Sequence, residues 1–136
     1  IIDLHTRYVV NWDISNAMTA QWCTGVLQEA IEKHGKPEIF NTDQGSQYTS
    51  EIHTNLLKDN DIKISMDGKG RAIDNIFIER LWRTVKYENV YLQAYNSTLE
   101  LYNGLKKYFN FYNNERFHQS LNYQTPSEFY YKKEVA

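Results

Sequence analysis

The run from Ala72 to Glu88, AIDNIFIERLWRTVKYE, constrains the fold of this chain more than any other stretch. Asp74 is a good N-cap residue, Ile73 can pack back onto Phe77, and the next glycine or proline comes only at Gly104. These features predict a helix. At about 100° per residue, one side of that helix carries the apolar residues Phe77, Ile78, Leu81, Trp82 and Val85.

The opposite side of the predicted helix carries a polar stripe. It consists of Asn75, Glu79, Arg83 and Lys86, so that one carboxylate lies between an amide and two cations. Taken alone, such a stripe indicates a solvated helix face with favourable i,i+4 pairs. A second acidic residue further upstream gives the stripe another interpretation.

That second acidic residue is Asp43, which follows the strand-like run 38–41 and precedes Gly45. This order places Asp43 at the carboxyl end of a strand, where open α/β sheets bind their ligands. Thirty-five residues separate Asp43 from Glu79. A carboxylate at a strand end and a carboxylate on a helix are therefore candidates for one site.

Two stretches at this spacing resemble a known family. NTDQGSQYTS at 41–50 and DNIFIERLWRTVKYE at 74–88 resemble the DDE transposases of bacterial insertion sequences, whose catalytic core is similar to that of retroviral integrases. The closing pattern of that family, YN..R.H..L....P, is matched by Tyr112, Asn113, Arg116, His118, Leu121 and Pro126. The resemblance implies a ribonuclease-H-like α/β fold, with a mixed sheet and helices on both of its faces.

The resemblance also implies the chemistry. Asp43 and Glu79 would be catalytic ligands of Mg²⁺ or Mn²⁺, with two ions in the complete enzyme, and no other cofactor is expected. The DNA-binding candidates are Lys86, Arg83, Asn75 and Lys69. The implied reaction is metal-dependent cleavage at transposon ends, followed by strand transfer into target DNA. The implied partners are these DNAs and further copies of the chain.

The family pattern requires three carboxylates, and the chain matches two. Asp3 corresponds to an acidic residue of the second strand, where we expect a structural role. We therefore expect the chain 1–136 to be an N-terminally incomplete core that lacks its central first strand and does not nick DNA by itself. Its open sheet edges would be covered either by the N-terminal hairpin closing onto the strand before Asp43 or by a second chain, and we expect the dimer. The alternative is a non-catalytic module that only binds DNA or partner subunits.

Composition and charge set the remaining bounds. With 136 residues, 41% of them hydrophobic and 15% aromatic, one domain is expected, with a helical, aromatic tail over 97–136 packed on it. Residues 1–67 hold 5 Lys and Arg against 10 Asp and Glu, whereas residues 68–136 hold 10 against 7. Positive charge therefore gathers where a phosphate backbone would bind, although random scatter of surface charge gives the same counts.

The sequence offers few other candidates for chemistry. Cys23 is the only cysteine, which favours a reducing compartment and a role as a small core residue rather than a nucleophile. No apolar run reaches membrane-spanning length, so a cytoplasmic bacterial protein, associated with the nucleoid when bound to DNA, is expected. The histidines show no metal-binding spacing and are interpreted as packing or surface residues: His5, His34, His53 and His118.

The remaining elements are predicted from periodicity and caps. Two short antiparallel strands are expected within 1–14, a strand over 62–65 and a basic loop over 66–71 that is either a linker or a segment closing over DNA. A helix is expected over 19–34, with its inward side formed by Trp22, Val26, Leu27, Ala30 and Ile31. A second helix is expected from Thr49 or Ser50 to Lys58, with Ile52, Leu56 and Leu57 inward. A third helix is expected from Ser97 to Asn114.

Overall fold

A computed structural model of the chain describes residues 1–68 and 76–135. The chain divides into two compact units. The sheet unit comprises Val10–Ile76, and the helical unit comprises Ile1–Val9 together with Phe77–Ala136.

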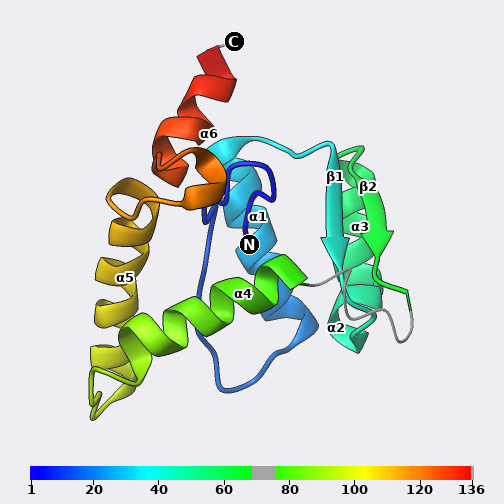
Figure 1. The fold of residues 1–136 in the computed structure, drawn as a ribbon. Coiled ribbons are helices and arrows are strands. Elements are labelled where there is room, and N and C mark those ends of the chain that lie inside the picture. The colour runs from blue at the N-terminus through cyan, green and yellow to red at the C-terminus, as the bar shows by residue number, and fades with distance from the viewer. Residues whose placement is uncertain (69–75, 136) are drawn as a thin grey trace. The chain divides into compact units, whose positions relative to one another are not determined.

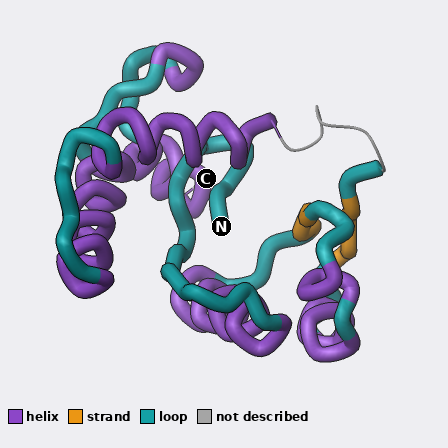
Figure 2. Tube along the Cα trace, turned by 90° about the horizontal axis from the view of Figure 1, so that it is seen from below, coloured by secondary structure: helices purple, strands orange, loops and turns teal. Residues whose placement is uncertain are grey.

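The sheet unit contains two parallel strands, β1 (Ile39–Thr42) and β2 (Lys63–Met66). Figure 1 shows them side by side. Their register pairs Ile39 with Lys63 and Thr42 with Met66, so both strands end at the same edge of the sheet. Parallel strands need a crossover connection, and the short helix α2 (Ser46–Thr49) and the helix α3 (Glu51–Asp59) provide it. Figure 2 shows this connection beside the strands.

Side-chain caps determine where the helices of the sheet unit begin. The helix α1 (Ala20–His34) starts at Thr19, whose hydroxyl accepts a hydrogen bond from the Trp22 amide, and it ends at Gly35, where φ is 77°. Ser50 caps α3 by accepting from the His53 amide. The predictions for these two helices are confirmed, and the two strands lie one residue beyond the predicted ones.

The core of the sheet unit forms where α1 packs on α3 and α3 packs on β2. Its buried side chains are Cys23, Leu27 and Ala30 of α1, His53 and Leu57 of α3, and Ile62. The prediction that Ile52 points inward is wrong, because Ile52 is 44% exposed. His53, one position further along α3, occupies the buried face in its place.

The helical unit is built around α5 (Thr98–Asn114), which Ser97 caps by accepting from the Glu100 amide. The helix α6 (Pro126–Val135) packs on α5, as does the π-helical turn η2 (Lys86–Val90) that extends α4 (Ile76–Val85). A short 3₁₀ turn, η3, spans Gln119–Leu121. The buried apolar residues of this unit are Val9, Leu81, Val85, Leu105, Tyr108, Tyr112 and Leu121.

The N-terminal segment forms a turn rather than the two predicted strands. A single antiparallel bridge joins Ile2 and Val9, and the prediction of two full strands within 1–14 is wrong. The Asp3 carboxylate accepts hydrogen bonds from the amide and the hydroxyl of Thr6, and Arg7 takes a φ of 64°. These local bonds close the turn within a few residues. Asp3 therefore lies in a turn, in agreement with its expected structural role.

Candidate active site

Asp43 lies just beyond the carboxyl end of β1, and its side chain is exposed. Its Oδ1 accepts a hydrogen bond of 2.7 Å from the Gly45 amide, and its carbonyl accepts one of 2.9 Å from the Thr42 hydroxyl. A Cβ at position 45 would lie 2.9 Å from Asp43 Oδ1 and 2.9 Å from Gln47 Oε1. Glycine at position 45 therefore lets the backbone approach the carboxylate closely enough to fix its orientation.

Asp67 lies beside this turn, directly after β2, and only 7% of its surface is exposed. Its amide donates to the Thr42 carbonyl at 2.8 Å, and its own carbonyl accepts from Gln44 Nε2 at 2.9 Å. Its Oδ1 accepts from Asn41 Nδ2 at 2.9 Å. Asp67 was not predicted from the sequence, because only the parallel pairing of β1 with β2 places it beside Asp43.

Three further side chains of the sheet unit are not activated for chemistry: Cys23, Tyr48 and His53. Burial raises the pKa of the Cys23 thiol, and a hydrogen bond with Tyr48 offsets this only in part. Burial also raises the pKa of Tyr48 to about 12, and the charges of Cys23 and Asp43 add to the effect. Because a protonated thiol is a poor nucleophile, the prediction that Cys23 is a core residue agrees with its surroundings.

His53 is a packing residue, as predicted. It is 1% exposed and lies between the rings of Phe40 and Tyr48, at centroid distances of 6.0 Å and 5.3 Å. Burial lowers its pKa. The imidazole is therefore kept neutral within the core of the sheet unit.

The polar stripe of α4 lies in the helical unit. Glu79, Arg83 and Lys86 are exposed, whereas Leu81 and Val85 are buried. The Arg83 guanidinium lies 5.5 Å from the centre of the Tyr87 ring. The apolar side is narrower than predicted, because Trp82 is 53% exposed. The predicted site residues Lys69 and Asn75, and the predicted helix start at Asp74, lie outside the described residues.

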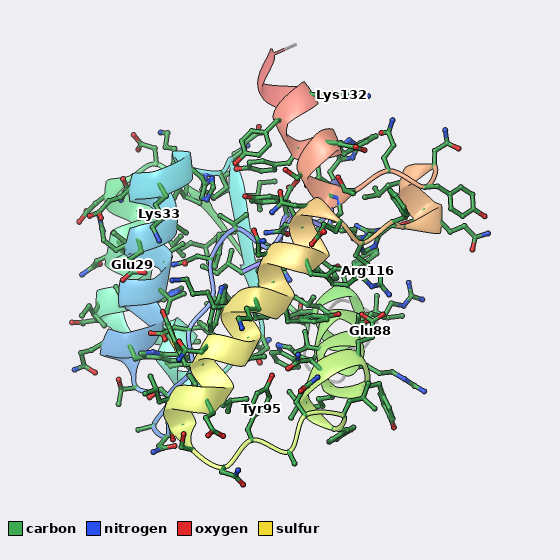
Figure 3. The ribbon with its side chains drawn as sticks, turned by 90° about the vertical axis from the view of Figure 1, so that its left-hand side faces the viewer. Glu29, Lys33, Glu88, Tyr95, Arg116 and Lys132 are labelled. Carbon is green, nitrogen blue, oxygen red and sulfur yellow. The ribbon has the colours of Figure 1, made fainter. Side chains whose placement is uncertain are left out.

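The helix changes its geometry at Lys86. The Tyr91 amide donates to the Lys86 carbonyl at 2.9 Å, which closes a π-helical turn with one residue more than an α-turn. Glu88 lies in this turn and accepts three hydrogen bonds of 2.9–3.0 Å from Arg116 and a further one from Tyr108. Figure 3 shows Glu88 of η2 next to Arg116, which follows α5.

The bonds to Glu88 connect the end of the α4–η2 helix to the C-terminal segment. Burial alone would raise the pKa of the Glu88 carboxyl, but the hydrogen bonds from Arg116 and Tyr108 outweigh burial and keep that pKa below its ordinary value. Arg116, a residue of the closing family pattern, thus holds the C-terminal segment to Glu88. The sequence alone predicts no role for Glu88.

His118 belongs to the same cluster. Burial, followed by the charges of Arg116 and Arg7, lowers the pKa of His118 to about 4. Its Nε2 lies 3.3 Å from an Arg116 nitrogen. Because a guanidinium can only donate, Nε2 is the acceptor and the ring is neutral. His118 is thus a structural residue, as predicted.

The two carboxylates of the predicted site come from different units. Asp43 belongs to the sheet unit and Glu79 to the helical unit, so a cation shared between them remains a prediction. The side chains of Asp43 and Glu79 fit a hard divalent cation, because both are exposed carboxylates. Beside Asp43, the buried Oδ2 of Asp67 has no hydrogen-bond partner among the described residues, which also suits a nearby cation. Within 1–68 and 76–135 no group of three or more His, Cys, Asp or Glu side chains gathers as a metal cage.

Comparison with known proteins assigns the class. The structure is similar to the catalytic core domain of HTLV-2 integrase, solved in complex with magnesium, with a TM-score of 0.73 and 21% identity over 93% of this chain and 79% of that one. A dimeric form of the same domain gives a TM-score of 0.71 at 20% identity, over 92% of this chain and 77% of that one. The fold is therefore that of the ribonuclease-H-like integrase cores, with a sheet reduced to β1 and β2 in the described residues.

The family follows from sequence models and relatives. Two models, each described as an integrase core domain, match residues 1–72 and 60–126. InsK of insertion sequence element IS150 from Escherichia coli strain K12 is 32% identical over 95% of this chain and 46% of its own length. The transposase for insertion sequence element IS904 from Lactococcus lactis is 33% identical over 94% and 52%.

The chain belongs to the integrase core domain family, among relatives that include insertion sequence transposases. Members of this family are polynucleotidyl transferases. The chain spans about half the length of the curated relatives it matches. Among the described residues, no helix combines the length and the apolar character needed to cross a membrane.

Proposed function

We propose that this chain is the catalytic core of a transposase that cuts DNA at the ends of an insertion sequence and joins those ends to target DNA. The observation that carries the proposal is the Asp43 turn, where an exposed carboxylate is held in a fixed orientation at the end of β1. The match to integrase core models over 1–72 and 60–126 supports it. The protein would act in the cytoplasm of a bacterium, where its DNA substrate lies.

Asp43 and Glu79 are the proposed metal ligands. Their carboxylates would hold Mg²⁺ or Mn²⁺, which prefer oxygen donors and retain several waters. When bound, two such ions activate the attacking oxygen and stabilise the leaving oxygen of an in-line phosphoryl displacement. The protein itself supplies the orientation of Asp43, through the Gly45 amide, and the placement of Glu79 on the exposed side of α4.

The cations of the helical unit are the proposed DNA contacts. Lys86 and Arg83 are exposed on the same helix as Glu79, where they would bind backbone phosphates near the reacting bond. Lys69 and Asn75 are proposed for the edge of the same surface on the basis of the sequence alone. Phosphate contacts of this kind fix the position of the DNA and carry little sequence information.

Substitution of the two carboxylates tests the proposal. In the full-length protein, Asp43→Asn or Glu79→Gln should abolish strand transfer while the fold and most DNA binding remain, because neutral amides are poor ligands for Mg²⁺. Strand transfer is measured with labelled transposon ends, and DNA binding by a mobility shift. Asp59→Asn, which neutralises an exposed carboxylate at the end of α3, is the matched control and should transfer strands normally. Undiminished transfer by either active-site variant contradicts the proposal.

Two further parts of the proposal concern the chain 1–136 by itself. The family mechanism requires three carboxylates, and the sequence assigns two, so the isolated chain should not nick DNA. Each of the paired strands β1 and β2 has a single strand neighbour among the described residues, and open edges favour association. We therefore expect a homodimer, which sedimentation measurements would detect. Mg²⁺-dependent nicking by the isolated chain would contradict the first expectation.

A further inference from the structure

Asp67 has an unusual environment for a carboxylate. Among the described residues, two buried side-chain atoms have no hydrogen-bond partner, Oδ2 of Asp67 and Nδ1 of His53. His53 is neutral and packs against the rings of Phe40 and Tyr48, whereas Asp67 is a carboxylate. A buried carboxylate oxygen without a donor costs about 1–3 kcal/mol or more, and such groups are rare in native proteins. The position of Asp67 therefore needs an explanation other than stability.

The hydrogen bonds around Asp67 place it next to the Asp43 turn. Asn41 and Ser65 are register partners, and the Ser65 hydroxyl donates to Asn41 Oδ1 at 2.8 Å. Asn41 in turn donates to Asp67 Oδ1. Side chains two residues apart on a strand share a face, so Ser65 and Asp67 lie on the face of β2 that carries this polar row. Asp43 lies two residues after Asn41, just beyond the end of β1.

The backbone of Asp67 is joined to the residues on both sides of Asp43. It bonds to the Thr42 carbonyl before Asp43 and to the Gln44 side chain after it. The two carboxylates therefore leave adjacent parallel strands at one edge of the sheet. One is exposed, and the other is buried with an oxygen that has no hydrogen-bond partner in the described part of the chain.

We propose that Asp67 is a positioning residue for the divalent cation that Asp43 binds, and that the negative charge of its buried carboxylate stabilises that cation without coordinating it. This inference rests on the proposed function, because it assumes that Asp43 is a metal ligand. A carboxylate beside a metal ligand adds negative charge to the site and so strengthens cation binding without direct coordination. Asp67 does not replace the third carboxylate that the family mechanism requires.

Neutral substitutions at position 67 separate this role from a purely structural one. An amide can still accept the hydrogen bond from Asn41, so Asp67→Asn preserves the row of polar side chains and removes only the charge and the free acceptor. Asp67→Ser removes the charge with a smaller neutral group and guards against misfolding caused by the amide. Without metal, both variants should unfold close to the wild-type temperature, because each replaces a buried charge that is only partly hydrogen-bonded by a neutral group.

The measurement is Mn²⁺ binding to the full-length protein, followed by electron paramagnetic resonance of the free ion. Asp67→Asn and Asp67→Ser should each weaken Mn²⁺ affinity about tenfold, which is the usual effect of losing an outer-shell partner. The rise in melting temperature caused by Mn²⁺ should shrink in parallel. Asp59→Asn, a charge-matched change at an exposed site of the same unit, should leave both readouts unchanged.

The outcomes distinguish a failure of the proposed metal site at Asp43 from a failure of the proposed role of Asp67. If Asp43→Asn abolishes Mn²⁺ binding while both Asp67 variants bind like wild type, the proposed function stands and the role of Asp67 is overturned. If Asp43→Asn itself binds Mn²⁺ like wild type, the proposed metal site is wrong, and the role of Asp67 is wrong with it. Weakened binding in the Asp67 variants, with wild-type melting behaviour in the absence of metal, supports the proposal.

Discussion

At the residue scale, the Asn113 side chain makes the hydrogen bonds to the Val9 backbone that a neighbouring strand would otherwise make. Its Oδ1 accepts from the Val9 amide at 2.8 Å, and its Nδ2 donates to the Val9 carbonyl at 3.0 Å. Both residues are buried, so these backbone groups would otherwise lack partners. A residue of the closing family pattern thus holds the N-terminal turn onto α5 within the helical unit. Residues selected by a family motif can therefore act in folding rather than in chemistry.

Lys86 is expected to act through its charge alone. Lys86→Ala should weaken DNA binding by a similar factor for all sequences and reduce the slope of log affinity against log salt by about 0.9, because one phosphate contact is lost. Fluorescence anisotropy titrations of the full-length protein at several salt concentrations provide the measurement. Lys106→Ala, an exposed lysine of α5, is the control. Wild-type affinity of Lys86→Ala at low salt excludes a phosphate contact.

His118 makes stability depend on pH. Its pKa is about 4 in the folded chain, against an ordinary value of 6.5, so the unfolded chain binds more protons between these values. The stabilising contribution of neutral His118 is complete above pH 6.5 and is lost as the pH falls towards 4. Urea unfolding at pH 7, 6 and 5 should show this decline, and His118→Gln should show a shallower one. An equal slope in both proteins means that other groups cause the decline.

At the element scale, the side chain of Tyr95, which precedes α5, explains why α5 has a glycine in its middle, at position 104. A Cβ on Gly104 would lie 2.0 Å from the Tyr95 hydroxyl oxygen, which donates to Asn89 Oδ1 at 2.7 Å. Figure 3 shows Tyr95 on the connection between the green helix α4–η2 and the yellow helix α5. The tyrosine thereby joins η2 to α5, and only glycine leaves space for its ring.

Gly104→Ala should therefore fail to stabilise the protein. Alanine in a helix interior normally adds about 1 kcal/mol relative to glycine, but here the Tyr95 ring must move and its hydrogen bond, worth about 1 kcal/mol, is lost. In a Tyr95→Ala background the same change should recover the stabilisation. Free energies of unfolding for the four proteins of this double-mutant cycle give the comparison. Equal effects of Gly104→Ala in both backgrounds would show that Tyr95 imposes no constraint.

The sequence predicted those elements whose signals are local. The caps at Thr19, Ser50 and Ser97 each involve a side chain and an amide three residues away, so the starts of α1, α3 and α5 could be inferred directly. The π-helical turn η2 and the N-terminal turn are held by partners far along the chain, because Glu88 bonds to Arg116 and the Val9 amide bonds to Asn113. No local pattern encodes those partners, and these two features were therefore missed.

The residues of the candidate site also divide into those with a local sequence signal and those without one. Asp43 could be predicted because a strand, an acidic residue and a glycine occur in order, and its exposure agrees with that prediction. Asp67 requires knowledge that β2 pairs with β1 in parallel, which only the fold supplies. Its proximity to Thr42 results from strand pairing across more than twenty residues of sequence.

At the scale of the whole molecule, the open question is whether the two proposed catalytic carboxylates bind the same cation. Asp43 comes from the sheet unit and Glu79 from the helical unit. Ligands of the same ion act as one group, and their substitutions are strongly non-additive, whereas ligands of separate ions contribute independently. The coupling between the two residues can thus be measured without reference to any distance.

We expect Asp43→Asn and Glu79→Gln each to weaken Mn²⁺ binding severely, and the double variant to be little worse than either, because the first substitution already destroys the shared site. Titrations of the full-length protein, followed by electron paramagnetic resonance, yield the affinities, and the double-mutant cycle yields the coupling energy. Asp59→Asn combined with Glu79→Gln serves as the uncoupled pair, since Asp59 is exposed at the end of α3. Additive losses in the Asp43 and Glu79 cycle would assign the two carboxylates to separate ions.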